Sequence, residues 1–201
     1  MATQSLKWAL LSGALALGLS SSVSAGGASA EMLANTCAGC HGTKGASVGP
    51  ATPIIGRMER ETFKETMKAF QEDEMYGTIM NRIAKGYTEE EIEKMADYFF
   101  RQDYVPAQQS FDKKLARKGE KLHRKYCEKC HEDGGRPVEG EDVEYALLAG
   151  QWTPYLRYAM EDFQNHRREM PKKMKKKIKR LLRKEGEKGL EALFAYYASQ
   201  Q

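Results

Sequence analysis

The stretch "KYCEKCH", from Lys125 to His131, decides how this chain is interpreted, because the same spacing occurs a second time. The earlier copy is "NTCAGCH", from Asn35 to His41. Together the two copies contain all four cysteines of the 201-residue protein, and they lie 90 residues apart. Cysteine is therefore used only within a C-x-x-C-H pattern, and the pattern is used twice.

Three kinds of chemistry use such a pattern. A thiol redox motif is expected beside a βαβ unit, but no run in this sequence alternates like a strand. One zinc site built from both C-x-x-C pairs would bracket roughly 15–20 residues, whereas 86 residues separate Cys40 from Cys127. Two separate zinc sites would each need a fourth ligand. The third chemistry, covalent attachment of haem, fits the pattern without such difficulties.

The spacing suits haem attachment for a geometric reason. Two thiols three residues apart lie on one side of a helical turn, where they can form thioethers with the two haem vinyl groups, and the adjacent histidine faces the iron. We therefore predict two covalently bound haem c groups. The thioether residues would be Cys37, Cys40, Cys127 and Cys130, and the proximal iron ligands would be His41 and His131.

The first thirty residues have the layout of an export signal. Lys7 gives a positive start, "WALLSGALALGL" (Trp8 to Leu19) is apolar, and small residues follow. The apolar run is shorter than the ~20 residues of a membrane-spanning helix, although an uncleaved anchor is the alternative. Residues 1–25 are predicted to be a signal peptide cleaved after Ala25, with Ala30 as the other candidate site. We expect a periplasmic mature protein without a membrane span.

An internal duplication extends beyond the two motifs. The segment "FKETMKAFQ" (Phe63 to Gln71) matches "LRYAMEDFQ" (Leu156 to Gln164) at an offset of 93, and "KMADYF" near residue 99 resembles "LFAYYA" near the end of the chain. Helical periodicity and a Thr88–Glu91 capping box predict an all-α fold. We predict two tandem helical domains, each around one haem: 26–102 and 113–201, joined by a linker over 103–112.

The distal iron ligands are expected to be methionines, which are common in electron-transfer cytochromes. Met80 is the candidate in the first repeat. In the second repeat Met174 competes with Met170. Met174 is favoured because its offset of 94 from Met80 lies between the offsets found on either side, whereas Met170 gives 90.

Two histidines, one proline and a basic run lie outside the two motifs, and each has two possible roles. His123 and His166 are interpreted as surface or packing histidines, with bis-histidine ligation as the alternative. The carbonyl of Pro50 is predicted to accept a hydrogen bond from Nδ1 of His41, with a plain turn proline as the alternative. The basic run "KKMKKKIKRLLRK" (Lys172 to Lys184) is interpreted as a solvated helix face, with docking to an acidic partner as the alternative.

The net charge does not point to nucleic acid as a partner. Without residues 1–25 the chain has 31 basic and 28 acidic residues, a formal charge of +3. This near balance gives no indication of nucleic-acid binding.

Beyond these patterns, the chain resembles a known family. The stretches "AEMLANTCAGCHGTKGASVGPATP", "PAQQSFD", "KLHRKYCEKCH" and "LAGQWTPYL" resemble the dihaem cytochrome c subunits of flavocytochrome c sulfide dehydrogenases. The resemblance covers nearly all of the chain after the signal peptide. It departs from the family pattern at "RREMPKKMKKK", which is unusually basic. It implies an all-α fold of two tandem class I cytochrome c-like domains, each around one covalently bound haem. It also implies a complex with an FAD-containing flavoprotein subunit that oxidises sulfide, and electron transfer through this chain to an external acceptor such as a small cytochrome c.

Two rival functions stay open on the sequence. One is a free dihaem electron shuttle to a terminal oxidase, which needs no flavoprotein. The other is an enzyme in its own right, such as a dihaem peroxidase or thiosulfate oxidase, which needs an open iron position. The methionine in each repeat argues against the second rival. No catalytic residue is assigned to this chain.

Overall fold

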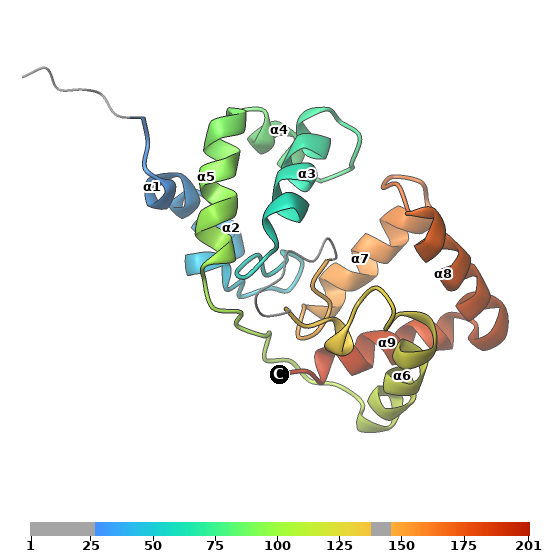
Figure 1. The fold of residues 1–201 in the computed structure, drawn as a ribbon. Helices are drawn as coiled ribbons and strands as arrows, with labels where there is room; N and C mark the ends of the chain where they lie inside the picture. The colour runs from blue at the N-terminus through green and yellow to red at the C-terminus, as the bar shows by residue number, and fades with distance from the viewer. Residues whose placement is uncertain (1–26, 138–145) are drawn as a thin grey trace, which may run out of the picture.

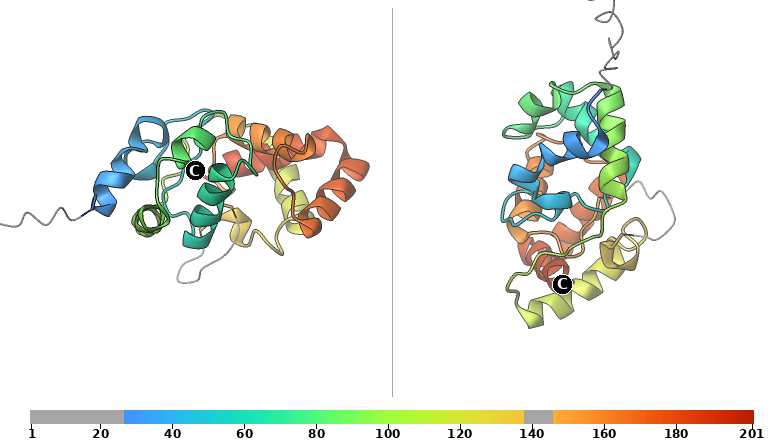
Figure 2. Two further views of the ribbon diagram at one scale, coloured as in Figure 1. Left: turned by 90° about the horizontal axis from the view of Figure 1, so that it is seen from above. Right: turned by 90° about the vertical axis from the view of Figure 1, so that its left-hand side faces the viewer.

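The computed structural model describes residues 27–137 and 146–201, so the predicted signal peptide lies outside the described residues. The described part is helical and contains no strand. Two groups of helices lie side by side and form an elongated molecule, with the C-terminus between the groups (Figures 1 and 2). The first group contains α1 (Ala30–Asn35), α2 (Ala38–His41), α3 (Arg60–Gln71), α4 (Met80–Ala84) and α5 (Glu89–Phe100). The second contains α6 (Lys113–Tyr126), α7 (Thr153–Gln164), α8 (Lys172–Glu185) and α9 (Glu187–Ala198).

We refer to the segment that carries α1 to α5 as the first half and to the segment that carries α6 to α9 as the second half. Between α5 and α6 the chain runs from Gln102 to Phe111 without a helix. The side chain of Asp112 then starts α6 by accepting hydrogen bonds from the amides of Lys114 and Leu115. The exact limits of the two domains and of the linker stay a prediction.

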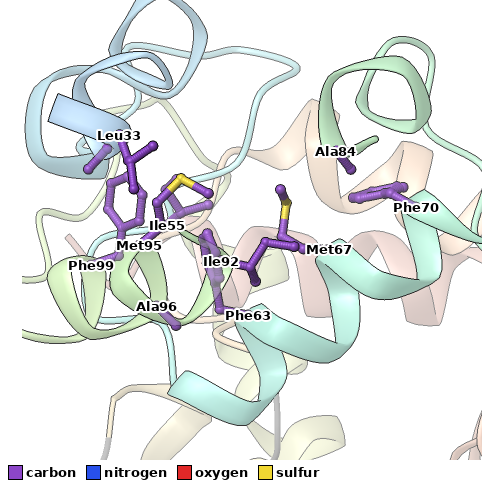
Figure 3. Packing of buried hydrophobic residues seen from close by; sticks show 11 residues of the cluster. Leu33, Ile55, Phe63, Met67, Phe70, Ala84, Ile92, Met95, Ala96 and Phe99 are labelled. Atoms are coloured by element: carbon purple, nitrogen blue, oxygen red, sulfur yellow. The ribbon is translucent and has the colours of Figure 1, made fainter. Parts of the chain in front are cut away.

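The core of the first half lies between α3 and α5. Phe63 and Met67 of α3 face Ile92 and Phe99 of α5 (Figure 3). This is the helical periodicity expected from the sequence, because residues three and four positions apart share one face of a helix. The predicted capping box is also present: the Thr88 side chain accepts from the Glu91 amide, and the Glu91 carboxylate accepts from the Thr88 amide.

The core of the second half lies where α6 crosses α9. The two helices approach closely at Gly119, where an added Cβ atom would lie 1.9 Å from the carbonyl oxygen of Ala192. A residue without a side chain is therefore required at the crossing. Around it pack Leu122 of α6 and Leu193 of α9.

Matching backbone hydrogen bonds show that the two halves repeat one loop structure. In the first half, the amides of Ile55 and Gly56 donate to the carbonyl of Gly45. In the second half, the amides of Leu148 and Ala149 donate to the carbonyl of Gly135 in the same way. Further along, the Arg57 amide donates to Phe99 and the Gly150 amide donates to Tyr197, both at 2.8 Å. The duplication predicted from the sequence is therefore present in three dimensions.

The halves differ most where the offset between them grows. The short α4 has five residues, whereas its counterpart α8 has fourteen. Nine of the residues of α8 are lysine or arginine, and all nine are exposed. Within the described ranges, no helix combines the length and the apolar composition needed to cross a bilayer.

Candidate haem-binding sites

Each C-x-x-C-H motif forms one turn of helix. The amide of His41 donates to the carbonyl of Cys37 at 2.8 Å, and the amide of His131 donates to that of Cys127 at 3.0 Å. The first motif follows α1 directly, and the second follows α6 directly, so each motif lies at the end of a helix as predicted from the sequence. This i to i+4 bond places each histidine one turn beyond the first cysteine, so that thiols and imidazole share one side of the turn.

The four cysteines are free thiols. Burial raises the pKa of the Cys37 thiol, and it raises the pKa of Cys127 to about 11. A thiol–disulfide redox motif needs the opposite change, since its reactive thiolate is favoured by a lowered pKa. No group of three or more potential metal-ligating Cys, His, Asp or Glu side chains occurs within the described residues. The raised pKa values disfavour the thiol–disulfide alternative.

His41 is held by a backbone carbonyl. Its Nδ1 atom lies 2.9 Å from the carbonyl oxygen of Pro53. A carbonyl can only accept, so Nδ1 carries the hydrogen and the lone pair is on Nε2. Burial lowers the pKa of His41, which keeps the imidazole neutral. The partner predicted from the sequence, Pro50, was wrong by three residues.

His131 has the equivalent arrangement. Burial lowers its pKa to about 4, and the backbone of Ala146 acts on the ring in the opposite direction. Ala146 follows Pro53 by 93 residues, which is the same offset that relates the loops of the two halves. Burial therefore favours a neutral imidazole at both positions, as a metal ligand requires.

These residues fit a covalently bound haem c. Each motif offers two free thiols on one turn, together with a neutral imidazole whose Nδ1 hydrogen is already committed in the case of His41. The assignment of Cys37, Cys40, Cys127 and Cys130 to thioethers, and of His41 and His131 to iron, stays a prediction.

The distal methionines lie at the hydrophobic cores. Met80 is partly buried against the core of the first half, and Met170 and Met174 are partly buried against that of the second. Matching backbone hydrogen bonds show that equivalent residues of the two halves remain 93 positions apart as far as residue 168. The Met75 amide donates to Ala69, as the Arg168 amide donates to Asp162. If the offset does not fall below 93 beyond this point, the counterpart of Met80 is Met174, 94 positions later, and not Met170, 90 positions later. The ligands themselves stay a prediction.

The two remaining histidines have structural roles. His166 is exposed and has a φ of 58°, at the turn that ends α7, as Asp73 has a φ of 59° at the turn that ends α3. His123 is fully buried. Its Nδ1 atom lies 3.0 Å from the Tyr197 hydroxyl, and its Nε2 atom lies 3.0 Å from the His131 carbonyl and 2.8 Å from a Glu128 oxygen. Both nitrogens of His123 are thus engaged by protein atoms, which argues against bis-histidine ligation.

Two side chains of the second half reach into the loop that supports His41. The Gln151 amide group pairs with both backbone groups of Ile54: the Ile54 amide donates to Oε1 at 3.0 Å, and Nε2 donates to the Ile54 carbonyl at 2.7 Å. The neighbouring Trp152 donates its Nε1 hydrogen to the carbonyl of Ser47 at 3.0 Å. The loop that supports His41 therefore forms one of the contacts between the halves; another is the bond from the Tyr76 amide to the Arg167 carbonyl at 2.9 Å.

Sequence reasoning did not foresee these supporting roles for Pro53, Ala146, Gln151 and His123. For His123 a signal was present in the repeat. His123 lies four residues before the first cysteine of its motif, as the buried Leu33 does in the first half. A histidine aligned with a core leucine is expected to be buried.

The fold and the two motifs define a class of protein that comparison with known sequences also identifies. The cytochrome c family profile matches residues 28–99. Cytochrome c-553 of Nitratidesulfovibrio vulgaris is 36% identical over 91 residues, which are 42% of this chain and 84% of that protein. The chain belongs to the cytochrome c family. Membership implies covalently bound haem c and a role in electron transfer.

A more particular similarity concerns the cytochrome subunit of sulfide dehydrogenase of Chlorobaculum tepidum. It is 42% identical over 69 residues, or 34% of this chain and 62% of that subunit, so the match spans less than two thirds of the relative. Among solved structures, the reduced recombinant cytochrome c4 of Pseudomonas stutzeri superposes with a TM-score of 0.70 at 21% identity, covering 87% of this chain and 100% of that chain. The predicted fold class, all-α with two cytochrome c-like domains, is confirmed.

Proposed function

We propose that this chain is the dihaem electron-transfer subunit of a sulfide dehydrogenase. In this function it receives electrons from the FAD of a flavoprotein subunit that oxidises sulfide, and it passes them to an external acceptor such as a small soluble cytochrome c. Covalent haem supplies one-electron redox chemistry at each motif. The chain itself holds the two groups, orients their proximal histidines and excludes water from them.

One observation carries the two-haem part of the proposal. The two C-x-x-C-H turns have the same backbone hydrogen bonds, and each is followed by a loop with matching backbone hydrogen bonds. The similarity to a sulfide dehydrogenase cytochrome subunit supports the flavoprotein partner. It covers only part of that relative, so the partner and the acceptor need their own test.

The uneven distribution of charge supports an acceptor contact on α8. The segment 26–102 has nine basic and twelve acidic residues, net −3, whereas 113–201 has 22 basic and 14 acidic residues, net +8. None of the basic residues of α8 makes an ion pair within the described ranges. The one acidic residue of the helix, Glu185, instead pairs with Lys118 of α6 at 3.0 Å. Burial raises the pKa of the Cys127 thiol, and the charge of the nearby Lys177 of α8 partly opposes this rise. In this proposal an acidic face of the acceptor docks beside the second motif.

Export to the periplasm is part of the same proposal. Cleavage after Ala30 would cut within α1 and remove Ser29, whose side chain caps that helix by accepting from the Met32 amide at 3.2 Å. Cleavage after Ala25 leaves the helix and its cap intact. This difference supports a mature chain that begins at residue 26.

Isolation of the native protein from its own cells tests the function and separates the rivals. The proposal expects a co-eluting flavoprotein and reduction of both haems when sulfide is added. A chain that elutes alone by size exclusion and is unaffected by sulfide would be a free electron shuttle. Binding of carbon monoxide to the reduced protein, or turnover of peroxide, would instead indicate an enzyme with an open iron position.

A further inference from the structure

We propose that Gln151, in the second half, sets the electron-donating strength of the His41 imidazole in the first half. The connection is the peptide group between Pro53 and Ile54. The inference rests on the proposed function only in requiring a haem at His41. It does not depend on the identity of the donor or of the acceptor.

The geometry forms a continuous chain of hydrogen bonds. Nδ1–H of His41 donates to the carbonyl oxygen of Pro53 at 2.9 Å. The N–H at the other end of the same peptide group, on Ile54, donates to Oε1 of Gln151 at 3.0 Å. Hydrogen bonds joined through one peptide group polarise each other. The bond from Ile54 to Gln151 therefore makes the Pro53 carbonyl a stronger acceptor for His41.

Gln151 is held in one orientation. It is only 3% exposed and Ile54 is 2% exposed, so the interaction lies away from water, where hydrogen bonds are electrostatically stronger. Its Nε2 atom donates to the Ile54 carbonyl at 2.7 Å, which fixes which end of the amide faces the Ile54 N–H. Its own backbone carbonyl accepts from Nε2 of Gln109 at 2.8 Å.

The second motif lacks an equivalent chain of hydrogen bonds. The equivalent peptide group joins Ala146 to Leu147, and the Leu147 N–H has no hydrogen-bond acceptor among the described residues. At the offset of 93, the position equivalent to Gln151 is Met58, which has no amide group in its side chain. The influence is therefore expected to act on one haem and not on both, and it would make two otherwise similar sites different.

The direction of the effect follows from ligand chemistry. A stronger acceptor at Nδ1–H increases the basicity of the metal-bound imidazole. A more basic ligand stabilises the oxidised, more positive iron, so Gln151 lowers the reduction potential of the haem at His41. Removal of the side-chain amide should raise that potential.

The test compares two variants of the holoprotein that each lose one contact between the halves. Gln151→Leu removes the bond to the Ile54 N–H. The control, Trp152→Phe, removes the bond from Trp152 to Ser47 but leaves the Pro53–Ile54 peptide group unaffected. Spectroelectrochemical titration gives the potentials of both haems. Proton NMR of the His41 Nδ1–H and the iron–imidazole stretching frequency report directly on the ligand.

We expect Gln151→Leu to shift the equilibrium constant for electron exchange between the haems by about threefold, which is roughly 30 mV for a one-electron couple. The change should come from the haem at His41, with a weaker iron–imidazole bond, and Trp152→Phe should cause neither effect. Equal shifts of both haems, or the same shift in the control, would overturn the inference. Gln151→Met provides a second variant of similar length should the leucine variant fail to fold. Absence of haem at His41 in the unmodified protein would refute the two-haem function itself, a result separable from an unshifted potential.

Discussion

Nδ1 of His123 lies 3.0 Å from the hydroxyl oxygen of Tyr197, at positions where the first half has Leu33 and Phe99. The equivalence is structural: Leu33 and His123 each precede the first cysteine of a motif by four residues. Phe99 and Tyr197 accept matching backbone hydrogen bonds from Arg57 and Gly150. A buried polar pair thus replaces an apolar pair, and it connects the second motif to α9.

The polar pair gives the first prediction. His123→Leu leaves the Tyr197 hydroxyl and the His131 carbonyl without their partner, which should lower the free energy of unfolding by ~3 kcal/mol. The double variant His123→Leu, Tyr197→Phe restores the apolar pair of the first half and should recover at least ~1 kcal/mol of that loss. Denaturant unfolding of the holoprotein measures both. Strictly additive losses would show that the two side chains do not act as a pair.

At the crossing of α6 and α9, we predict that replacing glycine by alanine destabilises the protein, although helix propensity alone predicts the opposite. Alanine normally stabilises a helix by ~1 kcal/mol relative to glycine. At Gly119 the added Cβ would lie 1.9 Å from the Ala192 carbonyl oxygen. We therefore expect Gly119→Ala to destabilise the protein by ~3 kcal/mol. At Gly39 a Cβ would meet nothing within 4 Å, so Gly39→Ala should leave the thermal midpoint unchanged or slightly raised. Equal effects at both glycines would contradict this account of the crossing.

The distal ligands can be separated by their spectra. Because the loop offset of 93 continues to residue 168, we predict that Met174 is the counterpart of Met80. Met80→Ala and Met174→Ala should each remove about half of the near-infrared charge-transfer absorbance that an iron–methionine bond gives the oxidised protein. Met170→Ala should leave that absorbance intact. A reversed result for Met170 and Met174 would show that the chain before α8 follows a different path to the iron.

The basic face of α8 should influence reaction with charged oxidants. Lys176 and Lys179 are exposed, as are the control residues Lys113 and Lys114 of α6. The double variant Lys176→Glu, Lys179→Glu places negative charge on this face. It should therefore slow oxidation of the reduced protein by the anion ferricyanide by about tenfold at low salt. The difference should fade as salt shortens the screening length. The control double variant Lys113→Glu, Lys114→Glu carries the same net charge. Its oxidation rate, measured by stopped flow, should stay close to that of the unmodified protein. A similar slowing in the control would point to net charge and not to α8.

Local patterns predicted much of this structure. The all-α class, the helices that lead into both motifs, the buried face of α3 and the Thr88 cap follow from residues close together in the sequence. The duplication could be read from matching segments. Except for the duplication, each signal lies within about four helical turns, and tertiary contacts agree with it.

What the sequence did not predict depends on contacts between distant segments. The choice of Pro53 and not Pro50 as the partner of His41 follows from the path of the loop. That path is fixed by Gln151 and Trp152, which lie 97 and 105 residues away from their partners. Burial of His123 likewise depends on Tyr197, 74 residues further on. Spacing alone does not encode such contacts.

The central claim is that both halves hold a haem in the same way. Intact-mass measurement of the native protein under denaturing conditions tests it most directly, because thioether-linked haem stays attached when the chain unfolds. The account predicts a chain that begins at residue 26 and carries the mass of two haems. Proteolytic fragments should place one haem on the peptide with Cys37 and Cys40 and the other on the peptide with Cys127 and Cys130. A mass with one haem or none, or free thiols in either motif, would contradict the claim.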